Sequence, residues 1–328
     1  MTILAEKASM PNMSAGPVSE AGYADREDMM AGHANAFPDL ERELRFCPLG
    51  VDSPGTLSKK QISRYNDQGF LAPITVFGDR EIADIREYVD RLLNGALAAG
   101  WTAGELTNWH LYCRGVYDLV THPRILDVVE DFLGGTIILR NCHFFIKLPG
   151  EGRRVSWHQD ASYWPLTPSK VISVWLAIDD SCPANGAMQV IPRSHLRPGL
   201  PFRRSAPEER NVLSQTVDNP EHYGDAPVSL DLKAGQISLH SDWILHGSEP
   251  NRSDRRRCGL AMRYLSCDVR ASDGWNRDSV ICRGADPSGH WADHPRPTRD
   301  SIPEKQQGTE RTTRSFTHGW TDRGTTGS

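Results

Sequence analysis

The sequence predicts an α+β fold, with helices in the first part of the chain and an antiparallel β sandwich or barrel after them. Up to Gly135, apolar residues recur at the spacing of amphipathic helices. Beyond Gly135 come short runs rich in β-branched and aromatic residues, separated by turn-forming Pro, Gly and Asn. A chain that places its helices before its strands in this way is typical of α+β domains.

Three helices are expected, over residues 58–69, 79–92 and 123–135. Ser58 opens the first helix with an S-x-x-Q capping box, in which serine and glutamine side chains satisfy backbone amides reciprocally. Asp79 is expected to cap the second helix. Pro123 suits the first turn of the third helix, which Gly134 and Gly135 end.

Six strands are expected after the helices, over residues 137–139, 144–146, 171–178, 188–191, 236–239 and 259–265. Residues 199–227 have no periodicity and contain several prolines. A loop of this length is usually either functional or disordered. We expect it to lie over one mouth of the barrel.

Composition limits the classes of function. The chain has 37 Lys and Arg against 42 Asp and Glu, so it has no general basic excess that would attract nucleic acid. No apolar run is long enough to span a membrane, and the N-terminus lacks the apolar core of a secretory signal. The seven cysteines are scattered without a C-x-x-C pair, so free thiols in a cytoplasmic protein are expected. Neither nucleic acid nor a membrane is therefore expected as a partner.

The main chemical signal is an H-x-D motif formed by His158 and Asp160. Alternate side chains of an extended chain share one side, so the imidazole and the carboxylate would face the same way. With a second histidine from elsewhere they would form the facial triad of non-haem Fe(II) oxygenases. A second H-x-D, at His240 and Asp242, shows that the pattern alone is not specific.

The sequence that follows favours the first pair, because His246 and then Arg257 come later in the strand-rich region. If these two residues lie on antiparallel strands joined by a turn over residues 250–253, they face each other, and residue 248 pairs with residue 255. A guanidinium in that place suits a fork-like ion pair with a carboxylate co-substrate. A β-bulge would bring Arg256 there instead, so the choice between the two arginines stays open.

Several motifs, in this order, closely resemble the phytanoyl-CoA dioxygenase (PhyH) family. They are Trp157-His158-Gln159-Asp160, Tyr163-Trp164-Pro165, Val174-Trp175, the run from Asn185 to His195, and His246-Gly247-Ser248-x-x-Asn251 with Arg257. The segments Leu57–Ile62, Asp67–Phe70 and His122–Asp127 resemble the same family. The resemblance covers about residues 57–270, which makes it more specific than any single motif.

The resemblance implies a double-stranded β-helix, a jelly-roll or cupin-like core, with N-terminal flanking helices. It also implies that the protein binds Fe(II), 2-oxoglutarate and O₂. His158, Asp160 and His246 match the iron ligands of the family. Arg257 and Ser248 match the residues that hold the distal carboxylate of 2-oxoglutarate.

Other site residues are implied less directly. Trp175 matches an aromatic residue near the co-substrate if a one-residue gap is allowed, and Asn141 lies where relatives place a co-substrate amide. A polar residue at a sheet edge is an equal interpretation of Asn141. Tyr163, Trp164 and Trp243 are candidates for the wall of the substrate pocket, although core packing would explain each of them as well.

By this resemblance the protein is a dioxygenase that hydroxylates an unactivated C–H bond of a small-molecule metabolite and releases succinate and CO₂. Relatives that halogenate lack the carboxylate that Asp160 supplies, which favours hydroxylation. Desaturation, epoxidation and ring formation by the same site stay open, as do a cupin-type isomerase and a non-catalytic jelly-roll metal-binding protein. A CoA- or carrier-linked substrate would need a basic rim, for which Arg203–Arg204 and Arg252–Arg257 are the candidates.

One catalytic domain is expected over residues 57–285, helical over 57–135 and jelly-roll over 136–270. Residues 1–56 are expected to form a partly disordered N-terminal tail, and residues 286–328 a C-terminal extension outside the resemblance.

Overall fold

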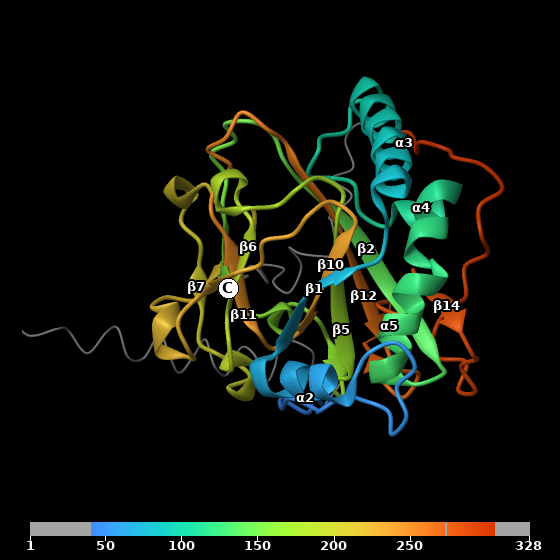
Figure 1. Cartoon of the computed structure of the whole chain (residues 1–328), viewed down its shortest axis with the longest axis vertical. Helices are drawn as coiled ribbons and strands as arrows, with labels where there is room; N and C mark the ends of the chain where they lie inside the picture. Colours follow the sequence, from blue (N-terminus) through green and yellow to red (C-terminus); the bar gives the residue numbers. More distant parts are fainter. Residues whose placement is uncertain (1–40, 273, 306–328) are drawn as a thin grey trace, which may run out of the picture.

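The computed structural model describes residues 41–272 and 274–305. The outer parts of both expected tails, residues 1–40 and 306–328, lie outside the described residues. Figure 1 shows two β-sheets facing each other, with helices against the outer side of one of them. The described part of the chain therefore has the α+β class that the sequence predicts, with a jelly-roll core.

The major sheet has six strands in the order β1-β10-β5-β12-β2-β14. Their bounds are β1 (Phe70–Thr75), β10 (Gln236–Ser241), β5 (Val171–Ala177), β12 (Arg257–Leu265), β2 (Ile137–Lys147) and β14 (Val280–Arg283). The minor sheet has the order β3-β11-β6-β9, formed by β3 (Val155–His158), β11 (Leu245–Ser248), β6 (Met188–Ile191) and β9 (Val228–Ser229). Two short pairs complete the strands, β13 (Arg270–Ala271) with β4 (Leu166–Thr167), and β7 (Arg203–Arg204) with β8 (Gln215–Thr216).

The helices largely follow the expected signals. They are α2 (Lys59–Gln68), α3 (Asp79–Ala98), α4 (Arg114–Val120) and α5 (Pro123–Leu133), of which α4 was not expected. The capping box of Ser58 is present and α2 ends at Gly69, whose φ of 84° is left-handed. The expected cap at Asp79 is wrong. Gly78 is the cap residue, and its backbone amide donates to the Glu81 carboxylate at 3.0 Å.

Within the described ranges, no helix has both the length and the apolarity needed to cross a membrane.

Strand β12 links the helical layer to the interior of the sandwich. It is buried along its whole length, and successive side chains point to opposite faces. Leu260, Met262 and Tyr264 belong to the core that also contains the apolar faces of α3, α4 and α5. Arg257 and Arg263, of the opposite parity, line a cavity between the two sheets. The helices therefore cover one side of β12 and leave its polar residues on the inside.

Strand β2 joins two strands that were expected separately, over 137–139 and 144–146. Its pairing with β12 is irregular between Leu139 and Asn141, opposite Tyr264 and Arg263. The extra residue there is Arg140, which forms a β-bulge. The polar run in the middle of the strand hid its continuity from a search for apolar residues.

The expected hairpin between His246 and Arg257 is wrong. Strand β11 pairs with β3 and β6, and His246 lies opposite His158. Strand β12 belongs to the other sheet, where Arg257 lies opposite Lys147. The physical reason is the jelly-roll topology: the segment after β11 crosses from the minor to the major sheet. Arg257 thus approaches the histidines from across the sandwich.

The flanking segments 41–56 and 286–305 pack against this core. Arg42 donates to the carbonyl of Ala161 at 2.7 Å, and the Trp101 indole donates to the carbonyl of Pro303 at 2.8 Å. The domain boundaries at 57 and 285 stay a prediction, and these packed segments adjoin them.

Replacing Asp131 should destabilise the fold. Its buried carboxylate on α5 accepts from the backbone amides of Gly55 (2.7 Å), Thr56 (2.9 Å) and Leu57 (2.6 Å). Asp131→Ala should lower the free energy of unfolding by about 1–3 kcal/mol, because these amides lose their acceptor. Urea unfolding measures this effect. Asp131→Asn keeps one acceptor oxygen and should lose less; an unchanged unfolding midpoint for the alanine variant would contradict the role.

Candidate active site

Three expected ligand residues converge in the cavity between the sheets. His158 is the last residue of β3, Gln159 continues the extended chain, and Asp160 opens a 3₁₀ turn, η2 (Asp160–Ser162). His246 lies beside His158 on β11. His158 Nε2 is 3.4 Å and His246 Nε2 is 4.0 Å from Asp160 Oδ1. All three side chains are buried, and one ligand atom of each lies within 4.8 Å of the others.

Backbone carbonyls fix the tautomer of both imidazoles. His158 Nδ1 lies 2.8 Å from the carbonyl of Ser156, and His246 Nδ1 lies 3.0 Å from the carbonyl of Ile244. A carbonyl can only accept, so each Nδ1 carries the hydrogen. Each Nε2 then has its lone pair free, which is the form that ligates a metal.

The two oxygens of Asp160 have different surroundings. Oδ2 faces the major sheet, with Ser173 Oγ at 3.5 Å, His240 Nε2 at 3.9 Å and Arg263 Nη2 at 3.9 Å. Oδ1 faces the two ligand histidines and has no hydrogen-bond partner among the described residues. The carboxylate therefore presents one oxygen to the imidazoles, while the major sheet holds the other.

The ionisation states also suit a metal. Burial by itself would raise the pKa of Asp160, but the neighbouring imidazoles of His158 and His240 and the charge of Arg263 lower it well below its ordinary value. Burial and the neighbouring His158 lower the pKa of His246 well below its ordinary value. One ionised carboxylate with neutral imidazole is the ligand chemistry of a divalent transition metal.

The rival H-x-D pair does not form a second centre. Asp242 is buried, accepts from Ser169 Oγ at 2.7 Å, and its pKa is raised by burial to about 7. His240 instead lines the cavity beside Asp160. Within residues 41–272 and 274–305, His158, Asp160 and His246 are the group of three that could hold a metal. In the sequence His240 stood out only as part of the second H-x-D pair, and its place beside Asp160 was missed.

Arg257 and Ser248 line the same cavity from opposite sheets. Arg257 is 3% exposed, and its Nε has no hydrogen-bond partner among the described residues. Its guanidinium lies 5.4 Å from the centre of the Trp175 ring. Arg256 points away, to Asp179 at 2.8 Å and Asp90 at 2.5 Å. Arg257, rather than Arg256, therefore faces the cavity.

A family profile described as phytanoyl-CoA dioxygenase (PhyH) matches residues 65–259. The chain belongs to the PhyH family. It is 29% identical over 240 residues to a probable alpha-ketoglutarate-dependent hypophosphite dioxygenase of Stutzerimonas stutzeri, covering 66% of this chain and 79% of that protein. It is 24% identical to an ectoine dioxygenase of Bordetella parapertussis, covering 65% of this chain and 76% of that protein.

Solved structures agree with this assignment. The non-heme monooxygenase ThoJ, in its apo form, superposes with a TM-score of 0.64 at 28% identity, over 73% of this chain and 88% of that one. This PhyH member is thus an Fe(II)- and 2-oxoglutarate-dependent dioxygenase that uses O₂ and acts on a small molecule.

The residues of this chain fit both groups that the PhyH family uses. The unpartnered Oδ1 of Asp160 and the two free Nε2 atoms suit Fe(II). The buried Arg257, with a donor still unpartnered among the described residues, suits a carboxylate of 2-oxoglutarate. Both matches rest on polar atoms that would otherwise be buried without a partner.

Trp175 can lie against Arg257 because the neighbouring residue, Gly259, has no side chain. Gly259 lies on β12 next to Trp175, and a Cβ at that position would overlap the indole ring. Sequence reasoning found Trp175 but missed Gly259, whose signal was a glycine inside an apolar strand.

The other expected site residues are not among the residues that line the cavity. Trp164 is fully buried beneath Arg263, whose guanidinium lies 5.6 Å from its ring. Tyr163 meets the His158 ring edge-on at 6.0 Å. Trp243 is fully buried, and Asn141 pairs in register with Arg263. Their roles in binding stay predictions.

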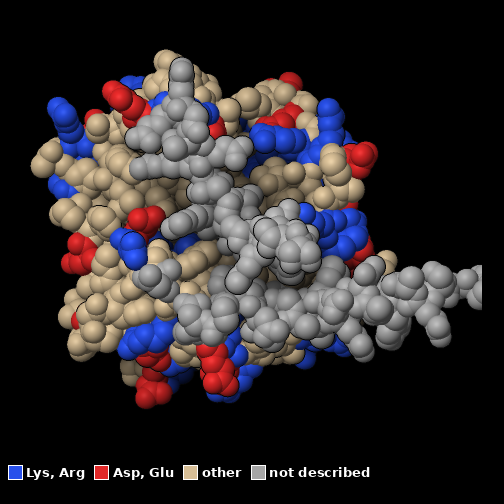
Figure 2. Space-filling model, turned by 180° about the vertical axis from the view of Figure 1, so that it is seen from behind, with Lys and Arg blue, Asp and Glu red and all other residues tan. Residues whose placement is uncertain are grey.

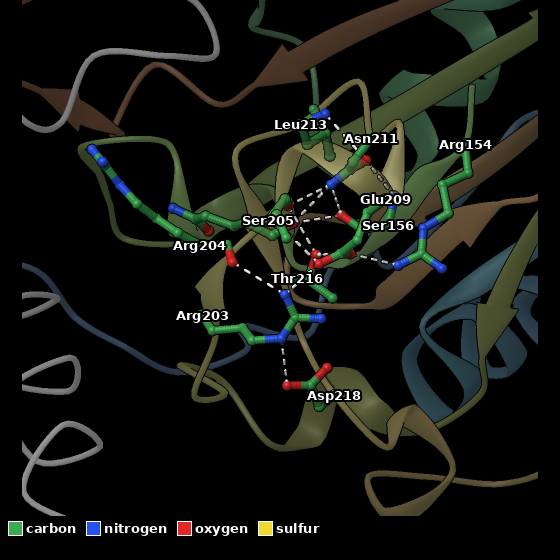
Figure 3. A network of polar contacts seen from close by, with 12 residues as sticks. Arg154, Ser156, Arg203, Arg204, Ser205, Glu209, Asn211, Leu213, Thr216 and Asp218 are labelled. Atoms are coloured by element: carbon green, nitrogen blue, oxygen red, sulfur yellow. Dashed lines mark hydrogen bonds and ion pairs between the residues drawn. The ribbon is translucent and has the colours of Figure 1, made fainter. Parts of the chain in front are cut away.

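The expected loop 199–227 contributes Leu213 to the cavity and is fastened by a polar network (Figure 3). Glu209 is its centre: it accepts from Arg154 Nη2 at 2.7 Å, from Thr216 Oγ1 at 3.3 Å and from Arg203. Hydrogen bonding to Arg203 lowers the pKa of Glu209 to about 2. The loop is thus tied by a charged contact to Arg154, the residue directly before β3.

Metal binding should stabilise the protein through His246. At a hundredfold excess over Kd, Fe(II) supplied without oxygen should add about 2.7 kcal/mol to the free energy of unfolding. His246→Ala should lose most of this gain, measured as the metal-induced shift in Tm. His222→Ala, which changes an exposed histidine, is the matched control. An equal shift in the His246 variant would contradict the assignment.

Removing the Glu209 carboxylate should loosen the loop. Glu209→Ala should increase the rate of limited proteolysis within residues 199–227 by about fivefold, the factor that corresponds to about 1 kcal/mol of local stability. Glu208→Ala alters the neighbouring exposed carboxylate and should leave the rate unchanged. Equal rates for the two variants would rule out the anchoring role.

Proposed function

We propose that this PhyH dioxygenase hydroxylates a C–H bond of a free small molecule, with His158, Asp160 and His246 as the ligands of Fe(II). The arrangement of Asp160 carries the proposal: one oxygen is held by the major sheet, and the other is left to the two imidazoles. Asp160 also fills the third ligand position, which supports hydroxylation over halogenation.

Bound Fe(II) would couple the oxidative decarboxylation of 2-oxoglutarate by O₂ to the oxidation of the substrate. The part of this chain is to place the reactants. Arg257 and Ser248 would bind the distal carboxylate of 2-oxoglutarate, and Trp175 would flank it. Arg263 and His240 would keep Asp160 oriented and ionised.

The cavity supports a small substrate. The space between its lining residues is about 490 Å³ and is partly open to solvent. Apolar side chains on several elements form part of its wall: Phe145, Val155, Met188 and Leu213. Leu213, on the fastened loop, would limit water at the reacting centre.

The charges of the described surface favour a free substrate over a CoA-linked one. Arg203 is paired with Asp218 and Glu209 (Figure 3). Arg256 is paired with Asp90 and Asp179. Figure 2, the view from behind, shows Lys and Arg beside Asp and Glu over the described part of the face that it displays. The arginine clusters that could have bound CoA phosphates are thus partly neutralised within the protein.

The seven cysteines are free thiols, which supports the cytoplasmic location expected from the sequence.

Succinate release tests this function. Release should require Fe(II), 2-oxoglutarate and O₂ together, and a screen of free and CoA-linked metabolites should find the faster rate with a free one. His158→Ala should abolish both release and the weak visible absorption of the anaerobic Fe(II)–2-oxoglutarate complex, because the metal loses a ligand. Arg257→Met should raise the KM for 2-oxoglutarate about tenfold or more, from the loss of a charged hydrogen-bonding pair.

Full activity in the His158 variant would overturn the assignment of the ligands. Absence of succinate release in the loaded wild-type protein, across the whole screen, would favour a non-catalytic metal-binding protein instead.

A further inference from the structure

The end of strand β2 carries a buried ammonium group next to the candidate co-substrate residues. Lys147 is 4% exposed and lies opposite Arg257 in the register of β2 and β12. Both residues line a second hollow that adjoins the metal cavity, and Arg257 lines both hollows. Two buried cations repel each other and lose hydration. Burial of the Lys147 ammonium group therefore costs free energy, and the metal site itself does not explain why the group lies there.

All the donors of Lys147 are used within the protein. Its Nζ donates to Ser248 Oγ at 2.7 Å, to the carbonyl of Ser248 at 3.3 Å and to the carbonyl of Glu249. An ammonium group has three N–H donors, and these three acceptors match them. Lys147 has no donor left for a ligand, so it can act on one only through Ser248 or through its charge.

The contact with Lys147 sets the direction of the Ser248 hydroxyl. An ammonium group cannot accept a hydrogen bond, so Ser248 Oγ is the acceptor in this pair. No acceptor for the hydroxyl hydrogen is present among the described residues. Ser248 also lines the metal cavity. Its hydrogen is therefore available to a carboxylate bound beside Arg257.

Two motif residues without a part in the metal site hold this arrangement. Gly186 has a φ of 78°, and a Cβ there would overlap the carbonyl of Glu249 and lie 3.2 Å from Lys147 Nζ. Asn251 Nδ2 donates to the carbonyls of Lys147 and Leu148, each at 3.1 Å. The turn at Gly186 and the segment after β11 thus both close on the end of β2.

We propose that Lys147 is a positioning residue for the distal carboxylate of 2-oxoglutarate. It orients the Ser248 hydroxyl as a donor toward that carboxylate and adds a second positive charge beside Arg257. The inference rests on the proposed co-substrate site. Under this proposal, Lys147 makes the protein bind 2-oxoglutarate more tightly than keto acids that lack a distal carboxylate.

The charge of Lys147 should depend on pH near neutrality. Burial and the charge of Arg257 lower the pKa of Lys147 to about 7, with Glu151 and Glu249 opposing the shift and Arg153 adding to it. The pKa of Arg257 is lowered by burial only to about 10. The ammonium form of Lys147 is therefore present below about pH 7 and lost above it, so the preference for a dicarboxylate should fall as pH rises.

The experiment compares two keto acids by calorimetry on the Fe(II)-loaded protein without oxygen. 2-Oxopentanoate has the keto-acid end of 2-oxoglutarate but no distal carboxylate, so the ratio of the two affinities cancels effects on the metal ligands. In the wild type this ratio should fall about tenfold between about pH 6.5 and pH 8.5. Lys147→Met should lower the ratio about tenfold at pH 6.5 and remove its pH dependence. Lys233→Met, at an exposed lysine, should change neither.

Equal weakening of both keto acids by Lys147→Met would show a merely structural role and overturn the proposal. If that variant does not fold, the wild type decides, because a ratio independent of pH also overturns it. Arg257→Met distinguishes a failure of the co-substrate site from a failure of the role of Lys147. An unchanged ratio in that variant would refute the co-substrate site itself; a collapsed ratio, with no effect of Lys147→Met or pH, would refute the role of Lys147 alone.

Discussion

The structure depends on how one buried carboxylate, that of Asp160, is shared between two sheets. An ionised group in the interior is costly unless neighbouring groups compensate its charge and its hydrogen bonds. Oδ2 obtains this from side chains of the major sheet, and Oδ1 faces two imidazoles of the minor sheet. The two sheets must therefore approach each other at this residue. A metal ion bound between Oδ1 and the two imidazoles would supply the positive charge that neutral imidazoles do not.

The same sandwich has to bury several cations. Arg257 and Arg263 share the inner face of β12, and Lys147 stands beside the first of them on β2. Asp160 compensates only one end of this row, since its Oδ2 lies near Arg263. The other end has the character of a site for an anion, which is where the distal carboxylate of 2-oxoglutarate would lie. The helices on the outer face shield β12 from water, so the hydration that these cations lose has to be offset by anionic groups between the sheets.

Local signals in the sequence predicted much of the fold. The capping box at Ser58, the proline at position 123 and the apolar runs after Gly135 each reflect interactions within a few residues, so they could be read directly. Pairing between strands could not, because it joins residues far apart in the chain. The hairpin drawn between His246 and Arg257 failed for this reason. Helix α4 was missed because it is short and owes its place to packing rather than to an extended periodic pattern.

For the candidate site, the sequence by itself determined the types of the ligands and their order. The H-x-D motif, the later histidine and Arg257 can be recognised from their spacing along the chain alone. Tertiary structure alone decided that Arg257 rather than Arg256 faces the cavity, and it brought His240, Arg263 and Lys147 to the site. Arg263 and Lys147 carry no local motif, and the H-x-D motif that contains His240 did not indicate its place beside Asp160. Their function comes from burial and from the charges they meet across the two sheets, and both are properties of the folded chain.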